Sequence, residues 1–120
     1  MELTEPTHNQ SLGDALDLLG SYRRRLVLAA VSATDGPVSL STLARELAAT
    51  ERDVDKAAVS LDERKRNEIR LHHTDIPPLS AAGLVRYDAE RNVVRSGEMP
   101  LEGEEWLEMP VIEALEAWNR

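Results

Sequence analysis

The chain has 120 residues, no cysteine and a formal net charge of −8. This length suits one domain with a single modest core, and the missing cysteines exclude disulfides and thiolate metal sites. No apolar run approaches the roughly 20 residues of a membrane-spanning helix, and the polar start MELTEPTHNQ lacks the features of a signal or transit peptide. We therefore expect a cytoplasmic protein that does not enter a membrane.

The acidic residues are unevenly distributed. Residues 1–95 hold 15 acidic and 13 basic residues, a net charge of −2, whereas residues 96–120 carry −6. The basic residues are almost all arginine, with lysine only at Lys56 and Lys65. An acidic, lysine-poor surface stays hydrated in high salt, and this composition resembles that of halophilic archaeal proteins. An ordinary acidic mesophilic protein is the alternative.

The first part of the chain predicts an arm and two helices. Residues 1–10 lack periodicity and predict a flexible N-terminal arm. Ser11 begins a short helical pattern, and Ser21 caps a longer one that ends at the DGP turn at 35–37. Three consecutive arginines, 23–25, fall in the second helix, where structural pairing with acidic neighbours and contact with phosphates are equally plausible roles.

The next segment predicts a short strand and a helix. Residues 38–40, VSL, form the strand, and Ser41 caps the helix TLARELAA. Thr50 and Asp53 resemble a further capping box. They predict a short extra helix over DVDKAAVS before the central helix.

The central helix is predicted from Leu61 to Asp75, with Ser60 and Glu63 as its capping box. The Pro77-Pro78 pair predicts a kink or break. Helical spacing then predicts one core-facing line along this segment, composed of Leu61, Ile69, His72, Ile76 and Leu79.

A hairpin and a tail follow the central helix. Residues 84–88 alternate as a half-buried strand does, residues 89–92 form the tip, and residues 93–95 return. Residues 96–120 form an acidic extension, and Pro110 suits the first turn of a final helix. Its apolar residues predict dimerisation, with folding back onto the domain as the alternative: Trp106, Val111, Ile112, Leu115 and Trp118.

The outward face of the central helix carries side chains suited to DNA. Arginine can hold guanine with two hydrogen bonds, and asparagine can do the same for adenine. The alternative is a solvated face whose cations pair with Glu63 and Glu68. The predicted DNA contacts are Arg64, Arg66, Asn67, Arg70, His73 and Thr74 on the helix, with Arg91 on the hairpin tip.

No pattern supports catalysis. The sequence lacks a nucleophile elbow, a P-loop, a dinucleotide fingerprint and an HExxH motif. Adjacent residues point about 100° apart on a helix, so His72 and His73 are unsuited to bind one metal together. We expect a protein that is not an enzyme and holds neither a metal nor a cofactor.

Two stretches together resemble a known family. SLGDALDLLGSYRRRLVLAAVSATDGPVSLSTLARELA and RKRNEIRLHHTDIPPLSAAGLVRYDAERNVVR resemble the winged helix-turn-helix domain of unknown function from halophilic archaea, over residues 11–95. The positions that match its H-T-x-x-P-x-L-x-x-AG segment are His73, Thr74, Pro77, Leu79, Ala82 and Gly83.

The resemblance implies an α+β fold of the winged helix-turn-helix class, with a three-helix core and a β-hairpin wing, to which the tail after Pro110 adds a C-terminal helix. It also implies a DNA-binding transcriptional regulator whose recognition helix enters the major groove of double-stranded DNA. We expect a homodimer. A protein–protein interaction module on the same scaffold is the alternative.

Overall fold

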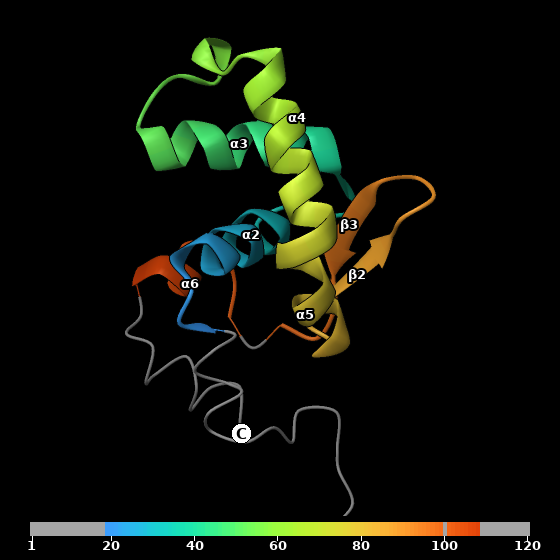
Figure 1. Cartoon of the computed structure of the whole chain (residues 1–120). Helices are drawn as coiled ribbons and strands as arrows, with labels where there is room; N and C mark the ends of the chain where they lie inside the picture. Colours follow the sequence, from blue (N-terminus) through green and yellow to red (C-terminus); the bar gives the residue numbers. More distant parts are fainter. Residues whose placement is uncertain (1–18, 100, 109–120) are drawn as a thin grey trace, which may run out of the picture.

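The chain folds as a mixed α+β domain (Figure 1). This computed structural model describes residues 19–99 and 101–108. The arm predicted over 1–10, the helix predicted from Ser11 and the helix predicted after Pro110 lie outside those residues, apart from the last turn at Leu19. The elements are α2 (Tyr22–Ser32), β1 (Val38–Ser39), α3 (Leu40–Arg52), a 3₁₀-helix (Lys56–Ala58), α4 (Leu61–Arg70), a π-helix (Leu71–Asp75), α5 (Ile76–Ala81), β2 (Val85–Asp88), β3 (Val93–Ser96) and α6 (Glu105–Glu108).

Three antiparallel strands form a small sheet in the order β1-β3-β2. The predicted hairpin is confirmed as β2 and β3. Its tip is held by Asp88, whose Oδ1 accepts the backbone N–H groups of Glu90 and Arg91. Asn92 then adopts a left-handed φ of 55°, a conformation that asparagine tolerates better than most residues. The short strand predicted at 38–40 pairs with β3, where Val38 faces Val94.

The helix α3 begins earlier than predicted. Ser39 is its N-cap, and the Ser39 hydroxyl accepts the backbone N–H of Thr42 at 3.0 Å. The prediction of Ser41 as the cap was wrong because the last residue of β1 already has the extended backbone that an N-cap needs.

The connection between α3 and α4 also differs from the prediction. Thr50 belongs to α3 rather than to a new cap, and Asp53 ends that helix with a left-handed φ of 56°. The expected extra helix exists as the 3₁₀-helix, with Asp55 as its cap. Ser60 caps α4 as predicted, because its hydroxyl accepts the backbone N–H of Glu63 at 3.1 Å.

The proline pair does not break the helix. The backbone of Asp75 and Ile76 stays right-handed helical, and the N–H of Ile76 donates to the carbonyl of Leu71, five residues back. Pro77 and Pro78 occupy the first turn of α5, where a missing N–H costs no helical bond. The predicted break is absent, and the departure from a regular α-helix is the π turn that immediately precedes the prolines.

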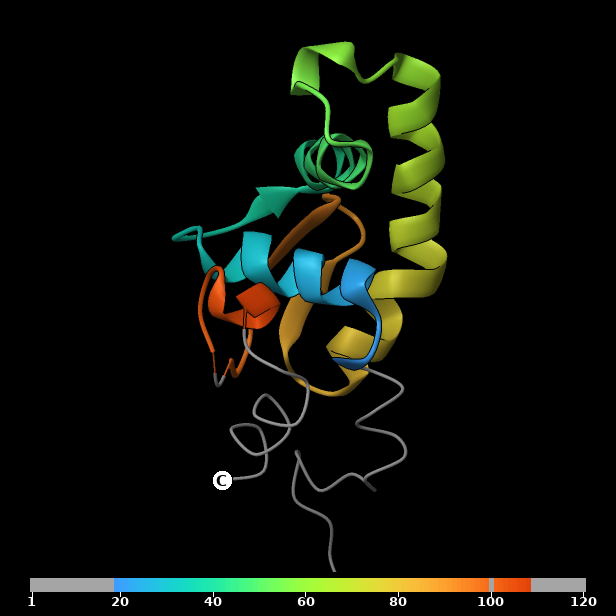
Figure 2. The same cartoon turned by 90° about the vertical axis from the view of Figure 1, so that its left-hand side faces the viewer.

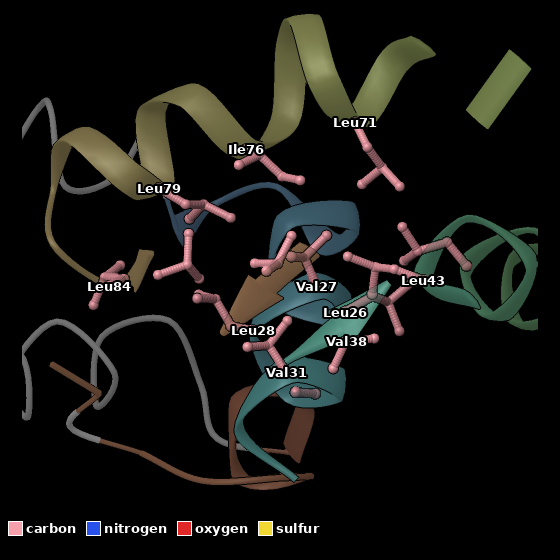
Figure 3. Packing of buried hydrophobic residues seen from close by; sticks show 14 of the residues in the cluster. Leu26, Val27, Leu28, Val31, Val38, Leu43, Leu71, Ile76, Leu79 and Leu84 are labelled. Atoms are coloured by element: carbon pink, nitrogen blue, oxygen red, sulfur yellow. The ribbon is translucent and has the colours of Figure 1, made fainter. Parts of the chain in front are cut away.

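The π turn also changes which residues face the core. Five residues at 3.6 per turn overshoot one turn by about 140°, whereas an i→i−5 turn aligns them. Leu71 and Ile76 are both fully buried and point toward α2, together with Leu79 (Figure 3). The predicted core line was wrong at two positions, since Leu61 is 54% and Ile69 62% exposed.

One hydrophobic core joins all layers. The helix α2 runs through its centre, with α3, the sheet, the π-helix with α5, and α6 around it (Figure 2). Trp106 of α6 is fully buried, and its indole N–H donates to the carbonyl of Leu101 at 3.1 Å. The described part of the acidic extension therefore shares the core of the residues before it.

Candidate functional site

The face of α4 that packs against α3 is polar. Four of its side chains are half-buried there, and no residue of α4 is fully buried. Glu63 forms an ion pair with Arg52 of α3 at 2.5 Å, and Glu68 lies 3.6 Å from Arg64. The amide of Asn67 donates to the Glu63 carbonyl at 3.0 Å. Both glutamates of α4 are thus engaged on its inner side.

The opposite face of α4 points to solvent (Figures 1 and 2). Lys65, Arg66, Ile69 and Arg70 are all exposed on it. Within the described part of the chain, neither Lys65 nor Arg66 has an ion pair. The solvated-face alternative required Glu63 and Glu68 to pair with the predicted DNA-contacting cations. Glu68 does pair with one of them, Arg64, whereas Glu63 pairs with Arg52 of α3. Neither glutamate pairs with Arg66 or Arg70 within the described residues.

The structure separates the predicted DNA contacts into two groups. Arg66, Arg70, His73 and Thr74 are exposed, as the prediction of an outward stripe required. Arg64 and Asn67 instead lie half-buried on the inner side, because α4 packs against α3 through this polar line. Arg91 projects from the hairpin tip with its side chain 82% exposed and lies 3.8 Å from Asp88.

A buried ion network fixes the base of α4. Arg23 of α2 is 5% exposed and donates through Nε to Asp75 of the π-helix at 2.6 Å. Its Nη1 donates to Glu51 of α3 at 2.9 Å. Arg70 Nε lies 4.0 Å from the same Asp75 oxygen. Of the two roles weighed for the arginines of α2, the structure therefore shows structural pairing for Arg23.

A second contact ties the π-helix to the hairpin. Nδ1 of His72 lies 2.7 Å from the hydroxyl of Tyr87 on β2, so His72 faces the domain as predicted. Burial raises the pKa of the Tyr87 phenol above its usual 10.0. His73 is exposed beside His72 in an edge-to-face arrangement. The helix and the hairpin are therefore held in one relative position.

The hairpin adds further cations. Arg86 and Arg95 are direct cross-strand partners, and both are exposed. They line an open hollow together with Tyr87 and Arg91. Like charges directly opposite one another destabilise a sheet, and no carboxylate in the described residues pairs with Arg86 or Arg95. Asp88 also lines this hollow and lies 3.8 Å from Arg91.

The described residues contain no group of three metal-ligating side chains, and none of their helices has the length and apolarity to cross a bilayer.

Trp106 was predicted as a dimer contact, but it is buried in the core of its own chain, as the fold-back alternative required. The remaining predicted dimer contacts lie outside the described residues: Val111, Ile112, Leu115 and Trp118.

Comparison with protein families finds a match over most of the chain. A family model described as a domain of unknown function (DUF7344) matches residues 16–95. Neither the curated proteins nor the solved structures include a match to the chain.

Proposed function

We propose that the chain, which belongs to this family of domains of unknown function, is a DNA-binding transcriptional regulator with a winged helix-turn-helix fold. In this proposal α4 enters the major groove, and the β2–β3 hairpin is the wing that contacts the flanking backbone. The order of α2, α3, α4 and hairpin supports the assignment, since α3 packs behind α4 and the hairpin follows it.

One observation supports the proposal most strongly, namely the division of charge on α4. Its glutamates Glu63 and Glu68 are paired on the inner side, whereas Lys65 and Arg66 have no ion pair in the described residues. Leaving cations unpaired on one helix face suits a partner that supplies the anions. The phosphates of duplex DNA provide them on both sides of the major groove.

The net negative charge of the chain affects the affinity for DNA and does not change which face of the protein would bind it. Affinity that depends on phosphate contacts falls steeply as salt rises, by a slope of about −0.9 per neutralised phosphate. The few exposed cations of α4 and the hairpin therefore predict a modest slope. Base contacts and shape must supply the remaining affinity.

Selection of bound genomic fragments tests the proposal. Fragments of the host genome are mixed with the protein at low salt and at molar salt, recovered and sequenced. The proposal expects a shared motif among the enriched fragments, and it expects Arg66→Ala to weaken binding to all of them and to lower the salt slope at an unchanged melting temperature. No enrichment in either salt would overturn it.

A protein-interaction module is the second candidate, and one observation favours it. Leu61 and Ile69 expose 54% and 62% of their surface on the same helix, and exposed apolar side chains are common at protein interfaces. A partner protein that co-purifies with the wild type and is lost on Ile69→Ser, together with no enriched DNA, would establish this alternative.

Homodimerisation remains part of the proposal. Trp106 belongs to the core, so a test must leave it in place. We expect the full chain to sediment as a dimer and a chain ending at Glu108 to sediment as a monomer. Equal sedimentation of the two chains would exclude residues 109–120 as the dimerisation element.

A further inference from the structure

Ile69 occupies the centre of the outward face of α4. It is 62% exposed, the largest exposed fraction among the large hydrophobic residues of the described chain. Two helical residues span about 200°, so the side chains of Ile69 and the fully buried Leu71 leave opposite sides of the helix. Among residues 19–99 and 101–108, the buried core does not include Ile69.

Two cations lie next to Ile69 on the outward face of α4, one on each side around the helix axis. Lys65 and Arg66 lie four and three residues before it, the spacings that place side chains next to each other on a helix surface. The exposed acid of α4 is Asp62, which lies in the first turn, where the helix dipole favours a carboxylate. The centre of the face is therefore an apolar side chain between two positive charges.

This arrangement suits the floor and the walls of the major groove. The groove walls are rows of phosphates, which the flanking cations can reach, and the floor presents base edges. Among those edges the C5-methyl group of thymine is the apolar group, and an aliphatic side chain gains free energy by contacting it. A partner protein would have to cover the cations as well. Leu61, the other exposed large apolar residue of α4, leaves the helix about 80° away from Ile69 and does not extend this patch.

We infer that Ile69 determines specificity by contacting the C5-methyl group of a thymine in the major groove. The inference rests on the proposed function and adds to it a base type at the centre of the bound site. Arg66 and Lys65 act beside Ile69 on the phosphates, so sequence preference and phosphate affinity come from different side chains of the same helix face.

The test replaces thymine by uracil, which lacks only the methyl group, in a fragment that the protein selects. Burying one such group changes affinity by about fourfold. We expect the wild type to bind the uracil fragment about fourfold more weakly and Ile69→Ala to bind both fragments equally. Leu61→Ala is the matched control, since it removes another exposed aliphatic side chain of α4, and it should keep the wild-type preference for thymine.

Each outcome separates the inference from the proposed function. If no fragment is selected, the proposed function fails and the inference fails with it. If fragments are selected but the wild type binds thymine and uracil forms equally, the inference alone is overturned. The inference is also overturned if Ile69→Ala keeps the preference for thymine over uracil. Loss of binding to a protein partner on Ile69→Ala, with DNA binding unchanged, would overturn it as well. The wild-type comparison does not depend on any variant folding, and Ile69→Val should show a preference between those of the wild type and Ile69→Ala.

Discussion

Replacing Asp75 by alanine should destabilise the fold more than its small side chain suggests. The substitution leaves Arg23 buried, with 5% of its surface exposed, after its shortest ionic contact of 2.6 Å is removed. Stranding one partner of a buried ion pair costs about 3–5 kcal/mol. Because Arg23 keeps Glu51, whose side chain is 35% exposed and partly screened, we expect about 3 kcal/mol, the lower end of that range.

Urea unfolding followed by circular dichroism measures this loss, with an unchanged slope showing that the two end states are comparable. The double variant Arg23→Met with Asp75→Leu removes both charges, so it should unfold within about 1 kcal/mol of the wild type. A loss below about 1 kcal/mol for Asp75→Ala would refute the role of the pair as the anchor of α4. A double variant as unstable as the single one would show that packing, rather than a stranded charge, sets the cost.

Three further predictions concern single positions. Ser39→Ala should cost about 1 kcal/mol in urea unfolding because it removes the N-cap of α3, whereas Ser41→Ala should cost less than half as much; equal losses would contradict the assignment of the cap. Burial raises the pKa of Tyr87 above 10.0, so the neutral phenol favours the folded state. The free energy of unfolding should therefore be constant below pH 10 and should fall as the pH rises through the folded-state pKa of Tyr87. Tyr87→Phe should make that fall smaller. Gly97→Ala would bring its Cβ to 2.3 Å from the Gly83 carbonyl oxygen, so a loss of about 1–3 kcal/mol is expected in thermal unfolding, and a wild-type melting temperature would contradict the close approach.

Local signals in the sequence were sufficient for several elements. The Ser60 cap, the β2–β3 hairpin and the inward position of His72 each depend on neighbouring residues or on one helix period. The same signals predicted the exposure of Arg66 and His73. These parts of the fold and of the candidate site follow from spacing alone.

The remaining parts depend on distant contacts. The projection of the central helix assumed 3.6 residues per turn throughout and took no account of the π turn after Arg70. It therefore aligned Ile69 with the buried Ile76, although Ile69 is exposed. A spacing of four from Glu63 to Asn67 to Leu71 marks the true inner line, but its polarity hides it. The pairing of Arg23 with Asp75 joins residues 52 apart in sequence, and no local pattern selects it over nearer acids.

The two lysines of the chain offer the most direct test of DNA binding by α4. Lys65 lies on the outward face without an ion pair in the described residues, whereas Lys56 lies on the 3₁₀-helix and pairs with Glu46 at 3.4 Å. The affinity of each alanine variant for a selected fragment is measured across a range of salt. We predict that Lys65→Ala weakens binding and reduces the salt slope by about 1, while Lys56→Ala changes neither. Equal affinities and slopes for the two variants would contradict the assignment of α4 as the DNA-binding face.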